Sequence, residues 1–370
     1  MKIHTVADPD EWNELVLGFP GADLRQSHEW GALRERLGWR PLRVAVRDQG
    51  RAVAAMAALA RRVPGLGTVA YAPRGPLLDT GDEAAWAALP LLLDDVRQRT
   101  GAVFLRVSPA IPAGATPGLA RLRAHGFRPL PELGTGWNVP RDVMMLSLAG
   151  SERELLAAMT PNRRQRVNSA ERKGVRIEIS STREALRVFH GALVDHATRR
   201  SYPLRGWDFF EALYRKFVAR NALVIVLAWA GGALAAAHLG VRFGPRAYAL
   251  YTPATPAAAG TPASEALEWA WIRWAKRAGC TAVDFGGSFT GVPPSPAHPN
   301  YGIYRFKQEI GCRLVLCAPY HDRVFAPLRY RLLRHAEQSL APWARRSLGR
   351  LQRGLRRRPP PAPRPAAAAA

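Results

Sequence analysis

The sequence predicts an α/β protein with mixed sheets, built from two similar modules in tandem. Its 370 residues leave room for two domains of ordinary size. Residues 29–108 and 206–288 repeat one order of elements, in which an amphipathic segment precedes three strands, a helix and a further strand. The motif Tyr-x-Pro-x-x-Pro occurs at residues 71–76 and again at 251–256, 180 residues later. An internal duplication accounts for both repeats.

Turn residues divide the first module into its elements. An amphipathic segment runs from Glu29 to about Leu37, and turns rich in Gly and Pro then separate the apolar runs. We expect strands between these turns, a helix that stops at Gly101 and a short strand after it, at 42–47, 52–61, 68–72, 83–99 and 103–107. An antiparallel meander followed by a helix and a strand suits the acyltransferase fold of the GNAT type.

The second module follows the same order. We expect helices at 207–219 and 263–277 and strands at 223–229, 233–241, 248–251 and 281–285. Residues 221–241 contain no Asp, Glu, Lys or Arg and are long enough to cross a bilayer. Gly231 and Gly232 lie at their centre, however, and β-branched residues precede them. We therefore interpret this stretch as a buried β-hairpin rather than a membrane span.

The two modules meet near residue 150. Ser151 and Glu154 form a capping box that starts a helix, and Ser181 and Glu184 repeat the pattern before a helix that runs to about residue 199. Between them we expect a helix over 161–173 and a strand over 175–179. These elements assign residues 1–149 to the first domain and residues 150–311 to the second.

The C-terminal part of the chain is strongly basic. Residues 329–364 hold eleven arginines and one acid, Glu337, and contribute +10 of the formal net charge of +24. Apolar residues at helical spacing predict a basic amphipathic extension over 326–358. Such a surface suits an anionic membrane or a nucleic-acid backbone, although a solvated helix packed on its own domain has the same pattern. Residues 359–370 are Pro and Ala apart from Arg364, and we expect them to be disordered.

The composition excludes several classes of protein. A hydrophobic content of 48% rules out wholesale disorder, and the charge of +24 favours acidic small molecules, nucleic acid or an anionic membrane as partners. The first ten residues lack the features of a secretory signal. Cys280, Cys312 and Cys317 form no Cys-x-x-Cys pair, so we expect buried thiols and neither a disulfide framework nor a metal site.

Three clusters carry residues suited to chemistry, namely Tyr71–Asp79, Val283–Ser288 and Tyr301–Gly311. The first ends a strand at a Gly-Pro pair, which leaves backbone groups free for a ligand but also fits a rigid turn. The third contains Lys307, one of only five lysines among 53 basic residues. A compact ammonium binds as a point charge, although an ordinary surface lysine is the alternative. Phosphate-loop, zinc-protease and nucleophile-elbow motifs are absent, as is the acetyl-CoA loop common in single-module GNAT enzymes.

Taken in order, the motifs resemble the Fem family of peptidoglycan-bridge aminoacyltransferases, in its compact FemX form. The matching segments span about residues 1–320 and are Ser27–Trp30 with Arg34, Tyr71–Asp79, Arg163–Gly174, Thr198–Arg200, Tyr251, Leu267–Gly279, Asp284–Gly287 and Arg305–Gly311. The resemblance implies two tandem GNAT-like domains, with the chain returning to the first at about 312–325. Residues 200–223 leave no room for the long helical arm that some members carry.

The resemblance also implies a reaction. Fem enzymes move an amino acid from aminoacyl-tRNA onto the side-chain amine of the third residue of a muropeptide stem, in a UDP-linked or lipid-linked precursor. In that scheme Lys307 lies by the reacting groups as a catalytic residue, and Asp79 is a candidate proton acceptor. The implied substrate-binding residues are Arg34, Tyr71, Arg74, Arg200, Tyr251 and Arg305. Arg34 and Arg200 would hold the diphosphate, and the family pattern has Lys where Arg34 stands.

Two other functions remain open at this level. A tandem-GNAT N-acyltransferase would use another activated donor such as acyl-CoA. A non-catalytic protein would use the same fold to bind RNA or a membrane. For the leading reading we expect no cofactor beyond aminoacyl-tRNA as co-substrate, a monomer, and a cytoplasmic location with peripheral contact at the inner face of the cell membrane.

Overall fold

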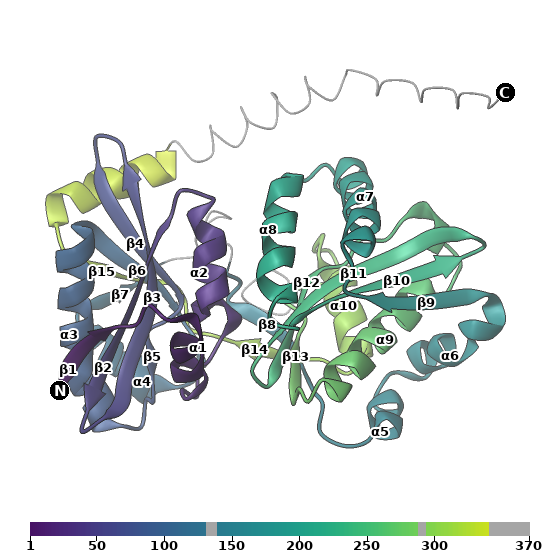
Figure 1. Cartoon of the computed structure of the whole chain (residues 1–370), viewed down its shortest axis with the longest axis horizontal. Coiled ribbons are helices and arrows are strands. Elements are labelled where there is room, and N and C mark those ends of the chain that lie inside the picture. Colours follow the sequence, from purple (N-terminus) through teal and green to yellow (C-terminus); the bar gives the residue numbers. More distant parts are fainter. Residues whose placement is uncertain (131–138, 288–293, 340–370) are drawn as a thin grey trace. The chain divides into compact units, whose positions relative to one another are not determined.

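The computed structural model describes residues 1–130, 139–287 and 294–339. The chain divides into a unit of residues 1–325 and a second unit that begins at Ala326. The first unit contains two mixed β-sheets with helices packed on their faces (Figure 1). This architecture confirms the predicted α/β fold with two tandem modules.

The first sheet contains β1 (Lys2–Thr5), β2 (Arg40–Asp48), β3 (Arg51–Val63), β4 (Gly67–Arg74), β5 (Leu77–Leu78), β6 (Ala102–Pro109), β7 (Phe127–Pro129) and β15 (His321–Val324). The strand order is β1-β2-β3-β4-β6-β15-β7, and β5 pairs with β3. β2, β3 and β4 form the predicted antiparallel meander. β4 and β6 are parallel because the helix α3 (Glu83–Thr100) connects them as a crossover.

The second sheet contains β8 (Asp142–Ser147), β9 (Val175–Ser180), β10 (Leu223–Ala230), β11 (Ala233–Phe243), β12 (Arg246–Tyr251), β13 (Ala282–Asp284) and β14 (Arg313–Leu316). The strand order is β14-β8-β13-β12-β11-β10-β9. The helix α9 (Ala263–Arg277) crosses over between the parallel strands β12 and β13, as α3 does in the first module. The predicted duplication is therefore visible in the topology of the two sheets.

The remaining helices cover the sheets (Figure 1). They are α1 (Pro9–Leu17), α2 (His28–Glu35), α4 (Thr116–Ala124), α5 (Glu152–Ala157), α6 (Pro161–Ser169), α7 (Arg183–Arg200), α8 (Trp207–Val218) and α10 (Tyr301–Glu309), with 3₁₀ turns η1 (Leu24–Gln26), η2 (Glu171–Lys173) and η3 (Pro256–Ala258). The capping box of Ser151 and Glu154 is present at α5. The second predicted box is wrong by one residue, because Thr182 rather than Ser181 caps α7 and accepts from the amide of Ala185.

The boundary between the sheets differs from the predicted one at residues 149 and 150. β8 lies in the second sheet, where it pairs with β13 and β14. Within the expected return segment 312–325, β14 also belongs to the second sheet, and β15 alone pairs with β6 and β7 of the first. The chain therefore enters the second sheet at Asp142, before the capping box that marked the boundary in the sequence.

The charge-free stretch 221–241 forms a hairpin, as predicted. β10 and β11 pair antiparallel through a two-residue turn at Gly231 and Gly232. Both glycines have positive φ, 57° and 77°, which a two-residue hairpin turn requires. In the described ranges, no helix combines the length and hydropathy needed to cross a bilayer.

Apolar residues from both modules share one core. Trp12 and Leu33 of the first module belong to the same buried cluster as Phe189, Phe210 and Tyr248 of the second. The hydroxyl of Tyr248 also accepts a hydrogen bond from the amide of Leu24 at 3.1 Å. Burial of large apolar side chains is the main stabilising contribution to such packing. The modules are therefore joined by a hydrophobic interface as well as by the chain.

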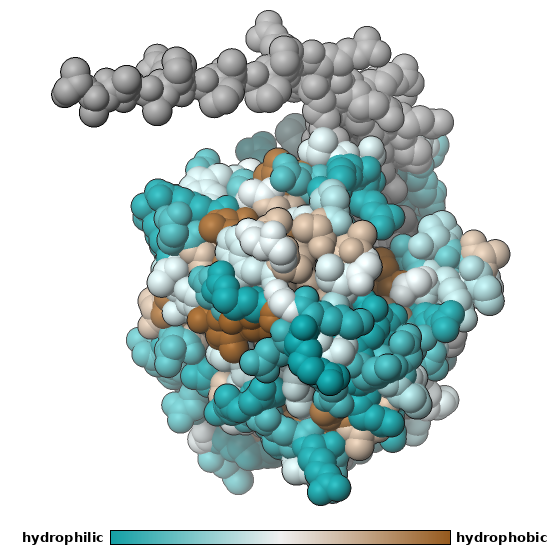
Figure 2. Space-filling model, turned by 90° about the vertical axis from the view of Figure 1, so that its right-hand side faces the viewer, coloured by the Kyte–Doolittle hydropathy of each residue, from teal (hydrophilic) through white to brown (hydrophobic). Residues whose placement is uncertain are grey.

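The outer end of the second module is mainly hydrophilic. Figure 2 shows this face, on which apolar residues form small separate patches among polar ones. Ile179 on β9 is an exposed apolar side chain, at 51%. Isolated residues of this kind are normal on soluble surfaces.

The second unit begins with a helix over residues 327–339. Its ion pair joins Arg334 to Glu337. The rest of the predicted basic extension to residue 358, and the Pro/Ala segment 359–370, lie outside the described residues.

Candidate functional site

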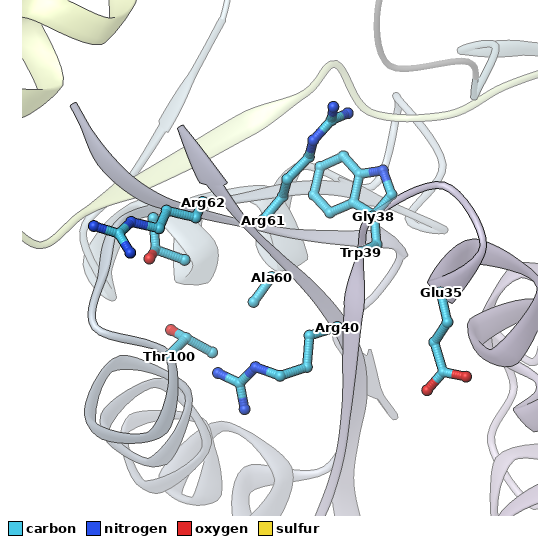
Figure 3. Close-up of a pocket in the computed structure, with 9 residues that line it drawn as sticks. Glu35, Gly38, Trp39, Arg40, Ala60, Arg61, Arg62 and Thr100 are labelled. Atoms are coloured by element: carbon cyan, nitrogen blue, oxygen red, sulfur yellow. The ribbon is translucent and has the colours of Figure 1, made fainter. Parts of the chain in front are cut away.

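A pocket of about 330 Å³ opens beside the loop between α2 and β2. Its lining residues are Glu35, Gly38, Trp39, Arg40, Ala60, Arg61, Arg62, Thr68 and Thr100. Figure 3 shows the Trp39 ring and the Arg61 side chain lying side by side at its edge. Three arginines and one glutamate give the lining a positive charge, which favours an anionic ligand.

The ring of Trp39 lies near two guanidinium groups. The Cζ atoms of Arg34 and Arg61 each lie 5.8 Å from the centre of its ring, within the range of cation–π attraction. The Tyr71 ring lies 6.4 Å from that of Trp39, and the Tyr320 ring lies 6.4 Å from that of Tyr71. The pocket edge is therefore formed in part by Trp39, which contacts two cations and begins a row of aromatic rings that continues to the buried side chain of Tyr71.

Arg34 is a partly buried arginine whose Nε has no hydrogen-bond partner among the described residues. Burial lowers its pKa below the ordinary value, and the positive charges of Arg205 and Arg61 act in the same direction. In the described part of the chain, no carboxylate forms an ion pair with any of these three arginines. We call Arg34, Arg61 and Arg205 the cleft arginines. Like charges held together without counterions are suited to a multiply charged anion such as a diphosphate.

Tyr71 and Tyr251, two of the implied substrate-binding residues, both lie beside Arg34. The phenol oxygens of both tyrosines interact electrostatically with the Arg34 guanidinium. Tyr251 is half-buried, its ring lies 5.1 Å from that of Phe210, and burial raises its pKa. Tyr71 is buried at 2% exposure, and burial raises its pKa well above the ordinary value.

Arg200 does not take the place assigned to it. It is exposed at the C-terminal end of α7. The positive charge that acts on Arg34 and Tyr251 from this part of the second module is that of Arg205, in the loop between α7 and α8. Arg205 lies five residues further along the chain than Arg200, where the backbone has left the helix.

The side chain of Arg74 is buried and forms its contacts within the protein. It is 3% exposed, and its Nη2 donates to the carbonyl oxygen of Pro140 at 2.8 Å. Its amide donates to Ser108 Oγ at 3.1 Å, and its Nε lies 4.0 Å from Asp23 Oδ2. These contacts hold the Arg74 side chain within the scaffold, and its assignment as a substrate-binding residue stays a prediction.

Asp79 and Arg305 lie on exposed surfaces. Asp79 follows β5 and accepts a hydrogen bond from the amide of Gly81 at 2.9 Å, as a turn acceptor does. Arg305 lies on α10 and pairs with Glu309 one turn later at 2.7 Å. Nothing in the described contacts joins either residue to the cleft arginines.

Lys307 lies on α10 and is partly buried. Its Nζ lies 3.3 Å from the carbonyl oxygen of Gly286 and 3.4 Å from that of Gly287. Burial lowers its pKa below the ordinary value, against the opposing charges of Asp284 and Glu268. The two glycines of the motif noted in the sequence therefore supply the carbonyl oxygens that accept hydrogen bonds from Lys307. Gly287 has no room for a side chain, because a Cβ atom there would lie 2.2 Å from the backbone oxygen of Asp142.

A buried charge network links the two modules next to Lys307. Arg25 of the first module pairs with Asp23 at 3.0 Å and reaches Asp284 of the second at 3.8 Å. Although burial raises the pKa of Asp23, the charges of Arg25 and Arg74 hold it below its ordinary value. Burial lowers the pKa of Arg25, but Asp23 and Asp284 raise it above its ordinary value. Asp284 is therefore shared between the module interface and the surroundings of Lys307.

The sequence analysis missed three site residues. Trp39 lies just before β2 and Arg61 lies near the end of β3, so most of both strands separates them in the sequence. Arg205 lies in a loop of the other module. The available signal was weak, since Trp39 follows a turn glycine and Arg205 lies two residues after Pro203. In an arginine-rich chain these positions do not stand out until the fold brings them together.

Two family models match different parts of the chain. A model described as the FemAB family matches residues 10–116, and one described as an acetyltransferase (GNAT) domain matches residues 160–308. Each falls in one of the two modules. The matches agree with the duplication read from the sequence and seen in the sheets.

Several known proteins are similar to this chain. The lipid II:glycine glycyltransferase of Staphylococcus aureus is 26% identical over 209 residues, which cover 55% of this chain and 49% of the relative. The chain thus matches about half the length of its curated relatives. A crystal structure of FemX has a TM-score of 0.82 at 19% identity, covering 90% of this chain and 99% of that one. A tandem GNAT protein from the clavulanic acid biosynthesis pathway has a TM-score of 0.51 at 15% identity, covering 87% and 97%.

These comparisons agree with the residues that carry the resemblance. The loop of residues 201–206 joins α7 directly to α8, so this fully described segment contains no additional helical arm. The fold matches that of FemX over nearly its whole length, and a FemAB model matches the first module. The chain therefore has a compact tandem GNAT fold and is similar to Fem-type proteins in both of its modules.

Proposed function

We propose that this protein is an aminoacyltransferase of peptidoglycan-bridge synthesis. It transfers an amino acid from aminoacyl-tRNA to the side-chain amine of the diamino acid in the stem peptide of a precursor. The observation that carries the proposal is the group of cleft arginines, which form no ion pair with a carboxylate among the described residues. Arg34 and Arg61 lie against Trp39, and the charge of Arg205 acts on Arg34 and Tyr251. A precursor diphosphate supplies the charge and the shape that such a group requires.

The reaction needs positioning more than strong activation. The precursor amine attacks the ester carbonyl carbon of the aminoacyl-tRNA, a C–N bond forms, and the C–O bond to the ribose breaks. The proton lost by the amine ends on the ribose hydroxyl that leaves. Because an ester is already activated, holding both substrates in line supplies much of the rate.

Lys307 is the proposed catalytic residue. Its ammonium lies at the end of β13, held by the two glycine carbonyls, where it would stabilise the oxyanion that develops on the ester carbonyl or the terminal phosphate of the tRNA. Asp79 is the carboxylate to test as a proton acceptor. Its exposure suits it to that role only if a bound substrate covers it, so direct transfer between the substrates is the simpler route.

The basic C-terminal extension fits the same proposal. Eleven arginines over residues 329–364 would attract either the tRNA backbone or the anionic inner face of the membrane, where a lipid-linked precursor would be found. The protein would then work in the cytoplasm, as a monomer that contacts the membrane peripherally.

A transfer assay tests the proposal. Several labelled aminoacyl-tRNAs are incubated with precursors that carry lysine or ornithine, UDP-linked and lipid-linked in separate arms. We expect a labelled, amide-linked product with at least one pair, and loss of that product when Arg205 is changed to Met. Transfer from acyl-CoA with none from any aminoacyl-tRNA would overturn the proposal.

A further inference from the structure

A second group of polar side chains lies inside the second module. His238 on β11 is fully buried, and its Nδ1 lies 3.0 Å from Thr252 Oγ1 and 3.5 Å from Glu268 Oε2 on α9. Glu268 is 5% exposed. The rings of His238 and Trp271 pack with their centres 4.5 Å apart. A carboxylate and an imidazole are thus held in place among apolar core residues.

Three buried atoms of this group have no hydrogen-bond partner among the described residues. They are His238 Nε2, Glu268 Oε2 and Trp271 Nε1. An unsatisfied buried polar atom destabilises a fold by about 1–3 kcal/mol, and native proteins keep few of them. Three such atoms on side chains that contact one another indicate a site where a bound polar ligand would supply a missing hydrogen bond.

The group lies next to Lys307. The negative charge of Glu268 acts both on Lys307 and on Cys312, which follows α10. No ion pair joins Lys307 to Glu268 in the described structure, so the ammonium and the carboxylate are near each other but not in contact. The parallel pairing of β12 with β13 ends at Tyr248 and Asp284. Beyond that point the carbonyls of the Gly-Gly pair face Lys307.

The two charges match the two ends of an esterified amino acid. Its ester carbonyl becomes an oxyanion during transfer and calls for a cation. Its α-ammonium lies one carbon away and calls for an acceptor such as a carboxylate. A plain acyl group, such as acetyl, has the first feature and lacks the second.

We propose that Glu268, supported by His238, binds the α-ammonium of the donor amino acid while Lys307 lies at its ester end. Glu268 is then the residue that distinguishes aminoacyl donors from uncharged acyl donors. This inference rests on the proposed function and adds to it a specificity-determining residue in the donor site. It also gives the unsatisfied Glu268 Oε2 a hydrogen-bond donor, supplied by the substrate.

The test compares a free and a blocked α-amine. The wild type, Glu268→Gln and Glu268→Asp are assayed with the most active aminoacyl-tRNA and with the same tRNA after N-acetylation of its amino acid. The control is Glu184→Gln, which removes an exposed carboxylate of the same module at the start of α7. Thermal unfolding of each variant checks that the fold is retained.

We expect N-acetylation to lower the wild-type kcat/KM by about 100-fold or more, because it removes the charge that a buried carboxylate recognises. Glu268→Gln should lower kcat/KM for the free donor by about 10- to 100-fold and leave the acetylated donor within about threefold of wild type. Glu268→Asp should keep most of the preference, since it keeps the charge. The control should behave like wild type with both donors.

The outcomes separate the inference from the function on which it rests. If the wild type transfers from no aminoacyl-tRNA, the proposed function fails first. If the wild type transfers but Glu268→Gln retains the full preference for the free α-amine, Glu268 does not bind that group and the inference is wrong. If Glu268→Gln unfolds, Glu268→Asp decides: loss of activity equal for both donors would assign Glu268 a structural role only.

Discussion

Replacing Arg34 with Met should weaken precursor binding and stabilise the protein at the same time. Arg34 is a cleft arginine that lies against Trp39, with its Nε buried and without a partner among the described residues. Met keeps the length and the apolar part of the side chain while removing the charge and the donors. The two effects therefore have different physical origins and opposite signs.

The expected loss of binding follows from the hydrogen bonds that a guanidinium gives a diphosphate. Such charged hydrogen bonds contribute about 1.5–3 kcal/mol. Since about 1.4 kcal/mol corresponds to a factor of ten, the Kd of the precursor should rise by about 10- to 150-fold. The remaining cleft arginines should keep residual binding that weakens as salt is added.

The expected gain in stability follows from the surroundings of Arg34. Its cation–π contact with Trp39 contributes about 0.5–1 kcal/mol, whereas the unsatisfied buried Nε costs about 1–3 kcal/mol. Burial and the neighbouring arginines lower the pKa of Arg34, which means that the fold disfavours its charge. We expect the free energy of unfolding to rise by about 1 kcal/mol.

Calorimetric titration with a UDP-linked precursor and urea unfolding measure the two effects. Arg36→Met is the matched control, because Arg36 is exposed two residues away and forms no described ion pair. The control should leave both quantities within experimental error of wild type. An Arg34→Met variant that binds the precursor normally, or that is destabilised by 1 kcal/mol or more, would refute the reading of the cleft arginines as a strained anion site.

Three further predictions concern other parts of the chain. Lys307→Met should reduce transfer by at least about 100-fold in kcat with the circular dichroism spectrum unchanged; normal turnover would exclude the role given to Lys307. Asp23→Asn should lower the free energy of unfolding by about 3 kcal/mol at pH 7, because it removes the carboxylate charge that pairs with the buried Arg25 and lies 4.0 Å from Arg74. The pKa of Asp23 is lowered by folding from 3.8, so this difference should be full well above pH 3.8 and shrink as the pH falls below it in acid unfolding curves; a pH-independent difference would contradict the assignment. Deletion of residues 326–370 should weaken binding to anionic vesicles or to tRNA in co-sedimentation and filter-binding assays without lowering the melting temperature of the rest; no loss of either binding would make the extension inert.

The elements that the sequence predicted well are those with local signals. α9 begins and ends where the sequence analysis placed it, since Ala263 follows a proline and the helix stops before Gly279. The hairpin of β10 and β11 was readable from its Gly-Gly turn. The segment before residue 29, with β1 and α1, received no assignment although Asp8 caps α1 in the usual way.

The features that the sequence analysis missed depend on distant pairing. Arg106 and Asp322 are fully buried and joined by two hydrogen bonds of 2.8 Å across 216 residues of chain. No periodicity or motif relates such residues before the sheet is formed. The same holds for the cleft, where Arg205 rather than Arg200 reaches Arg34. The sequence predicted that an arginine near the end of α7 would contribute. Which arginine lies near Arg34 depends on the path of the loop between α7 and α8.

The duplicated positions differ between the two modules in how a charged residue near the strand end is paired. Arg106 and Asp284 are each the fifth residue after the glycine that follows the crossover helix, Gly101 or Gly279. In the first sheet the residue paired with Arg106 is Asp322, which neutralises it. In the second sheet the residue paired with Asp284 is Met145, which cannot. The carboxylate is therefore left to act on Arg25 and Lys307. In the first module, the charge at this position is neutralised by the residue opposite it in the sheet. In the second module, the charge at the same position acts instead on the module interface and on the lysine that we assign to catalysis.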